Sequence, residues 1–347
     1  MAPSVDMARS FHLVARAATP SCAALTAVVD YRDRSLRLEG VPVLDHRLTV
    51  LRTFAARETI AATAEALGYS PSAVSAQLRE YQRALGVRLV VRDGRGLRLT
   101  AAGAELVERT DDLVALWEET HAAVRDADEH LAPAIVRLGG FSTATGSLLS
   151  PVAARLRADH PGLDVHIIEA DPARCVDLLT ADRLDIAVIV AMQMRHELNQ
   201  RRVEQIPLLD DPLDVLVPND HPLADRESVG LDELGGDPWI TDRPGTPYRA
   251  LFVTAFTAAG ATPRVVHQVS DWGSQESLVG DGLGVAFIPR LMRLSGDSRA
   301  VRIPLHGPSA PSRRVLAVMR RGAGAHSLFA ETLRELRSAA EATRTTG

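Results

Sequence analysis

The chain has 347 residues, of which 46% are hydrophobic and 24% charged, and its formal net charge is −5. This length predicts two or three domains, and the composition is ordinary for a globular protein with proper cores. The negative net charge argues against a protein that coats nucleic acid along its whole length, but it does not exclude a local basic region. All basic residues are Arg, which we interpret as the coding bias of a GC-rich genome.

The two cysteines, Cys22 and Cys175, are far apart and have no Cys or His at metal-ligand spacing. Neither a disulfide framework nor a zinc site is therefore expected. No apolar run approaches the ~18 residues that cross a membrane, and the N-terminal segment lacks the layout of a signal peptide. We expect a cytoplasmic protein without metal, cofactor or membrane contact.

Residues 1–43 show no sustained hydrophobic period and are interpreted as a poorly ordered extension, or as residues upstream of the true start of translation. From residue 44 the pattern predicts two short helices. The first has one apolar face, formed by Leu44, Leu48, Leu51 and Phe54. The second has Thr59 as its N-cap and ends at Gly68.

A third helix follows Tyr69, with Ser70 as its N-cap and Pro71 at its first position. Its predicted apolar stripe is Val74, Leu78, Tyr81 and Leu85. Its other faces carry small or hydrogen-bonding side chains, namely Ser72, Ala73, Ser75, Ala76, Gln77, Arg79 and Arg83. Such a surface suits a helix that enters the major groove of DNA, because bulky or acidic side chains would hold base edges and phosphates away.

The segment "GVRLVVRDGRGLRLT" predicts two strands around a Gly-rich turn. Helix, helix and hairpin together form a winged helix-turn-helix. Residues 44–100 contain nine Arg and five acidic residues, so this segment carries +4 within a chain of −5. Arginine contacts to phosphate supply much of the affinity of DNA-binding proteins. A winged helix used only for protein contacts is the alternative.

Thr100 is predicted to cap a long helix that reaches about Glu129. Six residues along it alternate spacings of four and three, as in a coiled-coil seam: Leu113, Trp117, Thr120, Val124, Ala127 and Leu131. We expect this helix to pair with a second copy of the chain, whereas packing on its own domain is the alternative. Pro133 then ends the helix.

Strands and helices alternate after Pro133, which predicts βαβ units on a mainly parallel sheet, arranged as two small α/β lobes around a cleft. The predicted organisation is a winged helix over 44–102, a linker and dimerisation helix over 103–132, and a two-lobed domain over 133–347. Lobe I takes 133–208 and 303–347, and lobe II takes 209–302. The fold class is thus multidomain α+β.

The N-terminal block "ETIAATAEALGYSPSAVSAQLREYQRALGVRLVVRDGRGLRLTAAG" resembles the DNA-binding domain of LysR-type transcriptional regulators. The resemblance continues through the linker helix into an effector domain of periplasmic-binding-protein type, with "HPLA" and "VGDGLGVAFIP". It implies a dimer or tetramer that binds a double-stranded operator, with RNA polymerase as a further partner of an activator. Ligand binding would shift the spacing of paired winged helices, whose half-sites lie ~34 Å apart.

We predict ten DNA-binding residues, some of them by this resemblance: Thr59, Ser70, Ser72, Ala73, Ser75, Gln77, Arg79, Arg83, Arg92 and Arg95. Pro71, Ala76 and Val90 depart from side chains common in the family. These departures leave the fold unaffected but make the preferred bases difficult to infer.

Three hydroxyl-rich loops at strand ends are predicted to line the cleft, where helix N-termini offer free N–H groups. The effector-binding candidates are Ser142, Thr143, Thr145, Thr241, Thr246, His267, Ser270, Trp272 and Ser274. Together they favour a small polar or anionic effector. The alternative is that these Ser and Thr residues only cap helices.

No catalytic motif is present: the sequence has no GxSxG, HExxH, Walker loop, or GxGxxG after a strand. Near pairs of acids are interpreted as caps and loop residues rather than acid–base pairs, namely Asp182 with Asp185, Asp210 with Asp211, and Asp237 with Asp242. A ligand-responsive DNA-binding regulator is the leading hypothesis. A small-molecule binding protein without DNA function is the main alternative, and an enzyme is the third.

Overall fold

The computed structural model describes residues 37–38, 41–42, 45–94, 96–127, 135–192 and 202–345. Within the predicted extension 1–43, it describes a short antiparallel pair of strands, β1 (Arg37–Leu38) and β2 (Val41–Pro42). The rest of that extension, with Cys22, lies outside the described residues.

Three helices begin the described domain: α1 (His46–Arg57), α2 (Ile60–Leu67) and α3 (Pro71–Leu85). Thr59 and Ser70 cap α2 and α3 as predicted, because each hydroxyl accepts a backbone N–H of the following turn. Gly68 ends α2 in the left-handed conformation, which a residue with a side chain adopts only at a cost. The short connection between α2 and α3 is that of a helix-turn-helix.

The inner face of α3 is confirmed for Val74, Leu78 and Tyr81, which are buried with α1 and α2 in one core. The predicted stripe is wrong at Leu85, which is 45% exposed. Leu85 occupies the last turn of α3, directly before the Gly86 C-cap, and this turn extends beyond the side chains that form the core.

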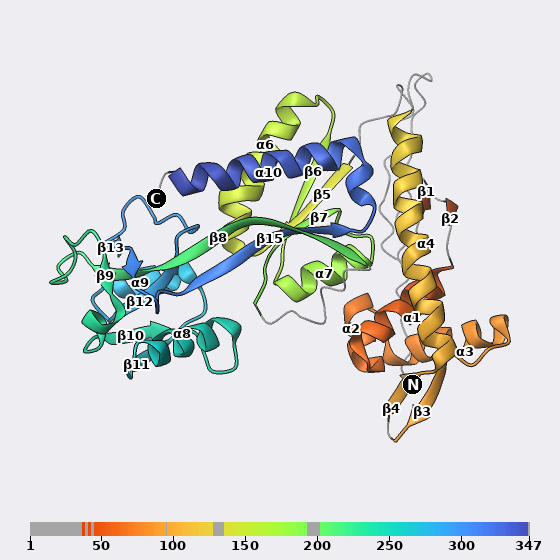
Figure 1. Cartoon of the computed structure of the whole chain (residues 1–347), viewed down its shortest axis with the longest axis horizontal. Coiled ribbons are helices and arrows are strands. Elements are labelled where there is room, and N and C mark those ends of the chain that lie inside the picture. Colours follow the sequence, from red (N-terminus) through yellow and green to blue (C-terminus); the bar gives the residue numbers. More distant parts are fainter. Residues whose placement is uncertain are drawn as a thin grey trace, which may run out of the picture. The chain divides into compact units, whose positions relative to one another are not determined.

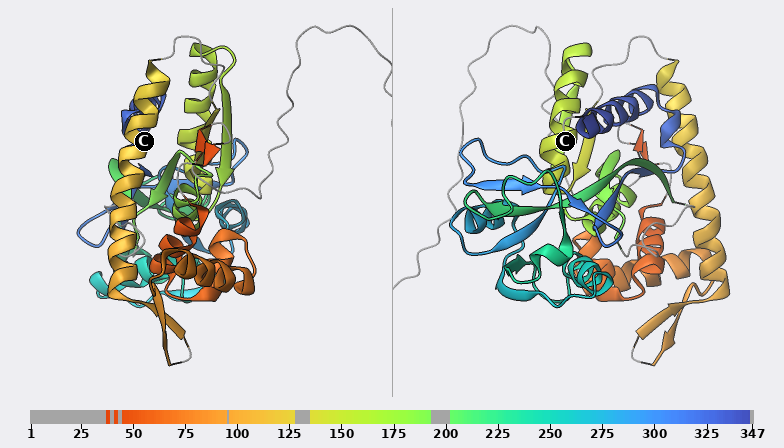
Figure 2. Two further views of the ribbon diagram at one scale, coloured as in Figure 1. Left: turned by 90° about the vertical axis from the view of Figure 1, so that its right-hand side faces the viewer. Right: turned by 60° about the vertical axis from the view of Figure 1, so that its left-hand side comes forward.

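The predicted hairpin is present as β3 (Val90–Asp93) and β4 (Gly96–Leu99), which pair antiparallel. In both views of Figure 2 this hairpin projects beyond the helices. Its base is tied to α3, because the side-chain carbonyl of Gln82 accepts the backbone N–H groups of Leu89 and Val90 at 2.9 and 3.0 Å. The domain is therefore a winged helix-turn-helix.

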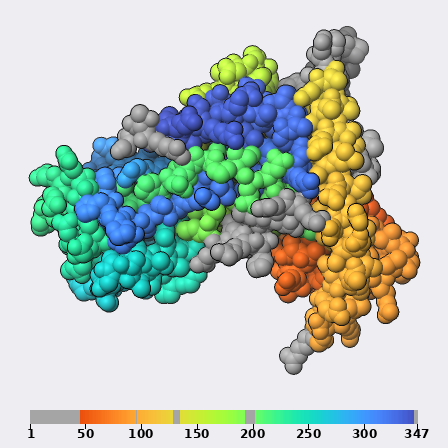
Figure 3. All heavy atoms as spheres, in the orientation of Figure 1, coloured from red at the N-terminus to blue at the C-terminus, as the bar shows by residue number. Residues whose placement is uncertain are grey.

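The linker helix is α4 (Ala101–Asp126), with Thr100 as its N-cap. One face is buried within the same chain through Val107, Val114, Ala115 and Ala122. The predicted seam lies on the other side, where Leu113 and Val124 are 54% and 55% exposed. Thr120 and Ala127 are exposed as well, Trp117 is half-buried, and Leu131 lies outside the described residues. In Figure 3 the side of α4 that faces the viewer is not covered by another coloured segment.

Lobe I is built around β5 (Ile135–Gly140), β6 (Asp164–Glu169) and β7 (Ile186–Val190), which run parallel. A helical segment follows β5 and includes α5 (Ser142–Ala144), the π-helical turn η1 (Thr145–Leu149) and α6 (Ser150–Asp159). Helix α7 (Pro172–Thr180) connects β6 to β7, and α10 (Ser327–Thr345) packs beside α6. Figure 1 shows α6 and α10 on one face of the sheet and α7 on the other.

Lobe II repeats this plan with β10 (Pro238–Thr241), β11 (Arg264–Gln268) and β12 (Val285–Pro289), again in parallel pairs. Helices α8 (Pro247–Ala258) and α9 (Trp272–Gly280) connect these strands. Trp239 is fully buried among Phe252, Phe256 and Phe287, with ring contacts at 5.0–5.5 Å. Short elements complete the lobe: β9 (Val229–Gly230), the 3₁₀ turn η2 (Leu231–Leu234), β13 (Ala300–Ile303) and β14 (Leu305–His306).

Two long strands connect the lobes, and here the sheet differs from the mainly parallel one expected. Within the described residues, β8 (Val203–Pro218) and β15 (Ser312–Arg320) pair antiparallel, and each also pairs antiparallel with strands of a lobe. The strand order β11-β10-β12-β8-β15-β7-β5-β6 is therefore mixed. The sequence concealed this, because Pro207 and Pro212 are unusual within a strand and predict breaks where β8 is continuous.

Candidate nucleic-acid interface and effector cleft

The outward face of α3 carries short side chains that are partly or fully accessible to solvent. Ser72 is exposed, and Ala73, Ser75 and Gln77 are half-exposed, while Val74 and Leu78 between them are buried. Ser70 both caps the helix and contacts the Ser72 hydroxyl at 2.9 Å. The carbonyl oxygen of Gln77 is buried and has no hydrogen-bond partner among the described residues. This helix can approach a groove closely because only hydroxyl, methyl and amide groups stand between its backbone and solvent.

Arginine side chains surround this small surface. Arg79 and Arg83 are exposed on α3, and Arg92 and Arg98 are exposed on the wing. Arg98 lies 3.7 Å from Asp93 across the hairpin, which is a weak surface contact. Thr59 is exposed at the start of α2, and Arg95 lies outside the described residues. Exposed guanidinium groups on α3 and on the wing suit contacts with the phosphates beside a groove.

The winged helix is held to the rest of the chain by a buried ionic triad. Asp111 on α4 accepts a hydrogen bond from Arg52 of α1 at 2.6 Å and another from Arg202, just before β8, at 2.9 Å. Arg202 also donates to the backbone carbonyl of Arg52 at 2.8 Å. All three side chains are at most 9% exposed. A second connection pairs Arg57 of α1 with Asp177 of α7. These contacts couple the winged helix to lobe I.

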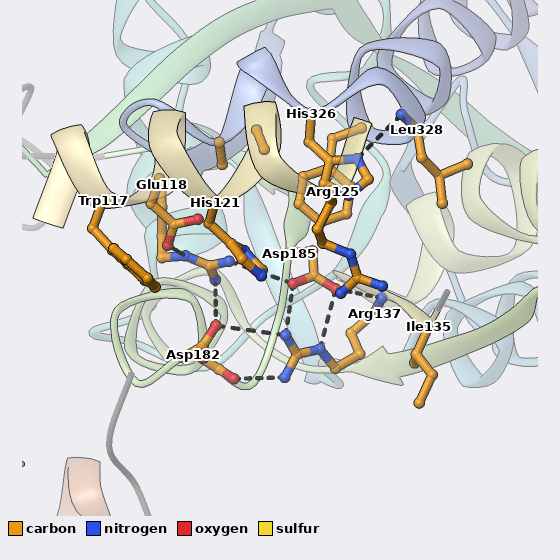
Figure 4. A pocket seen from close by; sticks show the side chains of 14 residues that line it. Trp117, Glu118, His121, Arg125, Ile135, Arg137, Asp182, Asp185, His326 and Leu328 are labelled. Atoms are coloured by element: carbon orange, nitrogen blue, oxygen red, sulfur yellow. Dashed lines mark hydrogen bonds and ion pairs between the residues drawn. The ribbon is translucent and has the colours of Figure 1, made fainter. Parts of the chain in front are cut away.

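A larger ionic cluster lies further along α4, beside a cavity of about 160 Å³ (Figure 4). The Arg320 guanidinium, at the end of β15, pairs with Glu118 of α4 at 2.5 Å and with Asp182 at 3.2 Å. Asp185 bonds Arg137 at 2.7 Å. Burial pushes the pKa of Asp185 upward, but the charge and hydrogen bonds of Arg137 outweigh it and lower the pKa. The cluster therefore fixes α4 to lobe I by charges that compensate one another.

Gly322 brings the backbone after β15 against α4. Its φ is +87°, and a Cβ built there would lie 2.4 Å from the carbonyl oxygen of Ala115. No side chain fits into that space, so glycine is required by both the conformation and the close approach.

The two lobes meet at Arg313 of β15, which is buried. Its Nε donates to Asp211 of β8 at 2.8 Å and one terminal nitrogen donates to the Thr143 hydroxyl of lobe I at 2.8 Å. The other terminal nitrogen donates to the Tyr248 hydroxyl of lobe II. Burial raises the pKa of Tyr248 although Arg313 opposes this, so the phenol stays neutral. Arg313 thus bridges the lobes with every nitrogen hydrogen-bonded.

Next to this bridge is a cavity of about 20 Å³, lined in part by Thr241, Ser270 and Trp272. That volume holds about one water molecule, and its lining residues all belong to lobe II. The Asp242 carboxylate lines it and accepts the Ser270 hydroxyl. The Oε1 of Gln275 is buried without a partner among the described residues, while its amide nitrogen donates to Val269 at 2.7 Å. The lining residues described here include a carboxylate and no cationic side chain.

The nine predicted effector-binding residues do not all lie at one site in the structure. Thr143 lies at the contact between the lobes, where it binds Arg313. The small cavity of lobe II beside this contact is lined in part by Thr241, Ser270 and Trp272. Thr246 caps α8 by accepting the Arg249 N–H, and Ser274 donates to Asp271, the cap of α9. Both residues therefore contribute to helix caps, which was the alternative to effector binding. Ser142 is exposed at the start of α5, Thr145 donates to Gly140, and His267 is half-buried on β11.

Several site residues were missed. Asp182, Asp185 and Asp242 lie in loops, as interpreted, and Asp211 lies in β8, but all four also pair with arginines or with a serine. Asp182 is half-buried, and the other three are buried. Their partners were missed because only neighbours in sequence were considered, whereas Arg313 and Asp211 are 102 residues apart. Arg313 and Tyr248 carry no local motif. Charged residues within apolar strands, as in "RRVLAVMRR", were the available signal.

Cys175 is fully buried in α7 and donates weakly to the carbonyl of Ala170. Burial raises its pKa to about 12, so the thiol stays protonated and unreactive. Over the residues that the structure describes, no group of His, Cys, Asp and Glu could hold a metal ion. No described helix is long and apolar enough to span a bilayer.

A winged helix with an arginine-flanked recognition helix, joined by a long helix to two α/β lobes, defines a DNA-binding protein with a ligand-binding domain. Residues 46–104 match the family model for bacterial regulatory helix-turn-helix proteins of the lysR family, and residues 130–341 match the LysR substrate binding domain. The chain therefore belongs to the LysR family of DNA-binding transcriptional regulators and carries its effector-binding domain.

Known proteins agree with this assignment. The chain is 30% identical to the HTH-type transcriptional regulator TtuA of Agrobacterium vitis, over 65% of this chain and 74% of that protein. It is 28% identical to the Hca operon transcriptional activator HcaR of Escherichia coli K12, over 75% of this chain and 86% of that protein. The crystal structure of HinK, a LysR family regulator from Pseudomonas aeruginosa, has a TM-score of 0.53 at 21% identity, covering 84% and 97% of the two chains, and supports the fold.

Proposed function

We propose that this LysR-type regulator reads its operator with the outward face of α3 and holds phosphate with the arginines of α3 and the wing. The observation that carries this is the combination of Ser72, Ala73, Ser75 and Gln77 on an accessible face with exposed Arg79 and Arg83 beside them. Groove entry requires small side chains, and phosphate contacts require free guanidinium groups. Ser70, Thr59, Arg92 and Arg95 complete the proposed DNA-contact set.

A gel-shift assay with the DNA upstream of the protein's own gene tests this proposal. Ser75→Glu places a charged, longer side chain on the groove-facing side and is expected to abolish the shift while leaving the melting temperature unchanged. The matched control is Ala84→Glu, because Ala84 is also exposed on α3 and lies nine residues, about half a rotation, from Ser75. Equal binding by both variants would reject α3 as the recognition helix.

We further propose that a small polar molecule binds between the lobes at Thr143, Thr241, Ser270 and Trp272. The Asp242 carboxylate and the unpartnered Gln275 oxygen favour a ligand that donates hydrogen bonds over the anionic one also considered. Since the cavity beside the Arg313 bridge holds only about 20 Å³, a larger ligand between Thr143 and the lobe II residues requires these bridging contacts to separate before the lobes close on it. Ser142, Thr145, Thr246, His267 and Ser274 are peripheral in this proposal.

Thermal-shift screening of polar metabolites, followed by gel shifts and DNA-bend measurements with each hit, tests the effector proposal. Asp242→Asn is expected to weaken binding of the hit, whereas Asp237→Asn, on the loop before β10, is the control. A hit that shifts the melting temperature and leaves footprint and bend angle unchanged would contradict regulation through this cleft.

The oligomeric state, the further partner and the domain limits are proposed on the same basis. We propose that the exposed seam of α4 joins two copies into a dimer or tetramer in the cytoplasm, with no enzymatic step. Lobe closure would then change the spacing of the paired winged helices, and where this promotes transcription, RNA polymerase is the partner. The proposed domain limits are 44–102, 103–132 and 133–347, after an extension over 1–43.

A further inference from the structure

A second groove, of about 630 Å³, lies between the lobes and shares no lining residue with the cavity beside Trp272. One wall comes from lobe I, through α6 and α10, and includes Arg155 and Ala339. The other wall comes from lobe II, through the segment after β12 and through Arg302 of β13. The lobes touch in this groove, where the Ser147 hydroxyl donates to the carbonyl of Leu291 at 2.7 Å. Its size is that of a small-molecule site.

Four arginines line this groove: Arg155, Arg290, Arg293 and Arg302. No Asp or Glu is among the described residues of its walls. Arg155 is compensated by Glu335 at 2.9 Å, and Arg290 binds the buried Asp214 at 2.6 Å. Asp214 also lies 3.9 Å from Arg302, so four guanidinium groups share two carboxylates and two positive charges remain in excess.

Of Arg293 and Arg302, the latter is the more buried. Its terminal nitrogens donate to the backbone carbonyls of Arg290 and Met292, at 2.8 and 2.5 Å. Its Nε is buried without a hydrogen-bond partner among the described residues, because Asp214 is 3.9 Å away. Burial accordingly lowers the pKa of Arg302. Arg293 is exposed at the rim, and no contact to its side chain is found in the described part of the chain.

Apart from the hydroxyl residues Ser147 and Thr343, the rest of the lining is apolar. Pro151 of α6, Leu291, Met292 and Leu294 of lobe II, and Ala339 and Ala342 of α10 line the space between the guanidinium groups. A purely inorganic anion would leave this surface in contact with water, whereas an anion with a hydrocarbon portion would cover it.

We propose that this groove is a second ligand site, which binds an organic dianion with an apolar portion, held by Arg293 and Arg302 of lobe II and by Arg155 of lobe I. Two negative charges match the excess of two guanidinium groups over the two carboxylates that pair with them. The ligand contacts both lobes at once, so its binding favours the arrangement in which α6 and α10 lie against the segment after β12. The groove shares no lining residue with the cavity beside Arg313, and the N–H of its Leu291 donates to Asp211, the partner of Arg313, at 2.9 Å.

The test uses the full chain and phthalate, a benzene ring with two adjacent carboxylates, titrated by calorimetry at constant ionic strength. Saturable binding with a Kd in the micromolar to millimolar range is expected. Arg293→Glu and Arg155→Glu, which reverse the charge on opposite walls, should each weaken binding about tenfold or more, as loss of a charged contact does. Inorganic phosphate, which has the charge without the ring, should bind more weakly than phthalate.

The matched control is Arg264→Glu, an equal change of charge at an exposed arginine of β11 outside the groove. It should bind phthalate like the unmodified chain, and melting temperatures of all three variants should show that they fold. Absence of saturable binding would overturn the proposal. So would an equal loss of affinity in Arg264→Glu, which would indicate unspecific attraction, or equal affinities for phosphate and phthalate.

Discussion

Arg52 of α1 donates to the buried carboxylate of Asp111 on α4 at 2.6 Å, and so joins the winged helix to the linker helix. Arg202 binds the other oxygen of the same carboxylate from the side of lobe I. One acidic residue thus compensates two cations from two different domains. Removing it leaves both guanidinium groups buried without a counter-ion, which is far more costly than losing a surface pair.

Asp111→Asn is therefore expected to lower the free energy of unfolding by about 3–5 kcal/mol, measured by urea denaturation. Asp112→Asn is the control, because Asp112 is half-exposed and meets Arg321 only at 3.4 Å. That change should cost less than about 1 kcal/mol. Equal losses in the two variants would show that the triad contributes no special stability.

Arg79→Gln is expected to weaken operator binding and to reduce the slope of log affinity against log salt by about 0.9, the contribution of one phosphate contact. Arg109→Gln serves as control, since Arg109 is exposed on α4 and pairs with Glu105. Gel shifts at several salt concentrations measure both slopes. An unchanged slope for Arg79→Gln would remove this residue from the DNA-contact set.

Leu116→Asp should weaken self-association through α4. Leu116 is 59% exposed and lies near Leu113 and Val124 on the uncovered face of the helix. Burying such a side chain against a second copy contributes about 1.5–3 kcal/mol, so a charge there should raise the dissociation constant about tenfold or more. Sedimentation equilibrium measures this. Leu283→Asp, at a 43% exposed leucine between α9 and β12, should leave association unchanged.

The free energy of unfolding should fall as the pH drops below about 6.5, which is the ordinary pKa of a histidine side chain. Burial lowers the pKa of His326, so the folded state favours the neutral ring, and this stability is lost as the pH falls from the ordinary pKa through the lowered one. Geometry agrees, because Nδ1 of His326 accepts the N–H of Leu328 at 3.3 Å and cannot do so when protonated.

Urea midpoints at pH 8 and pH 5.5 would measure this loss, which should be smaller in His326→Gln. His121, Arg125, Asp126 and Asp185 also act electrostatically on this ring, so His121→Gln, at a second ring whose pKa burial lowers, is a useful comparison. An identical pH dependence in the His326→Gln variant and the unmodified chain would contradict the assignment.

Cys175 should resist alkylation in the folded protein at neutral pH. Its pKa is raised to about 12 by burial, so the reactive thiolate is scarce. Mass spectrometry of the Cys175 peptide after iodoacetamide treatment, with and without urea, distinguishes the two states. Rapid modification of the folded chain, or oxidation of Cys175 by dilute peroxide, would contradict this.

Local signals in the sequence were sufficient for the DNA-binding half. Caps, a proline at the first helical position and a four-three stripe are short-range features, so α2, α3 and the wing could be located closely. The error at Leu85 arose because periodicity does not tell how far the neighbouring core extends. The family resemblance contributed the overall domain plan.

The cleft was predicted less completely, for a physical reason. Arg313, Asp211 and Tyr248 are brought together by the pairing of β8 with β15 and by lobe contact, neither of which leaves a local spacing. Thr143 was predicted because it lies in the first turn of a helix after a strand. Its partner Arg313 was not predicted. Thr246 and Ser274 show the converse, because a hydroxyl at a helix start serves the helix first.

The glycine at position 322 offers a way to measure coupling between the linker helix and the effector domain. Because the Ala115 carbonyl occupies the place of a Cβ, substitutions of increasing size would act as wedges of graded thickness under α4. Each wedge would displace the helix that carries the winged helix, without touching the DNA-contact residues or the ligand cleft. A series of substitutions from alanine to leucine would thus measure how far α4 can be displaced before effector binding no longer changes operator binding.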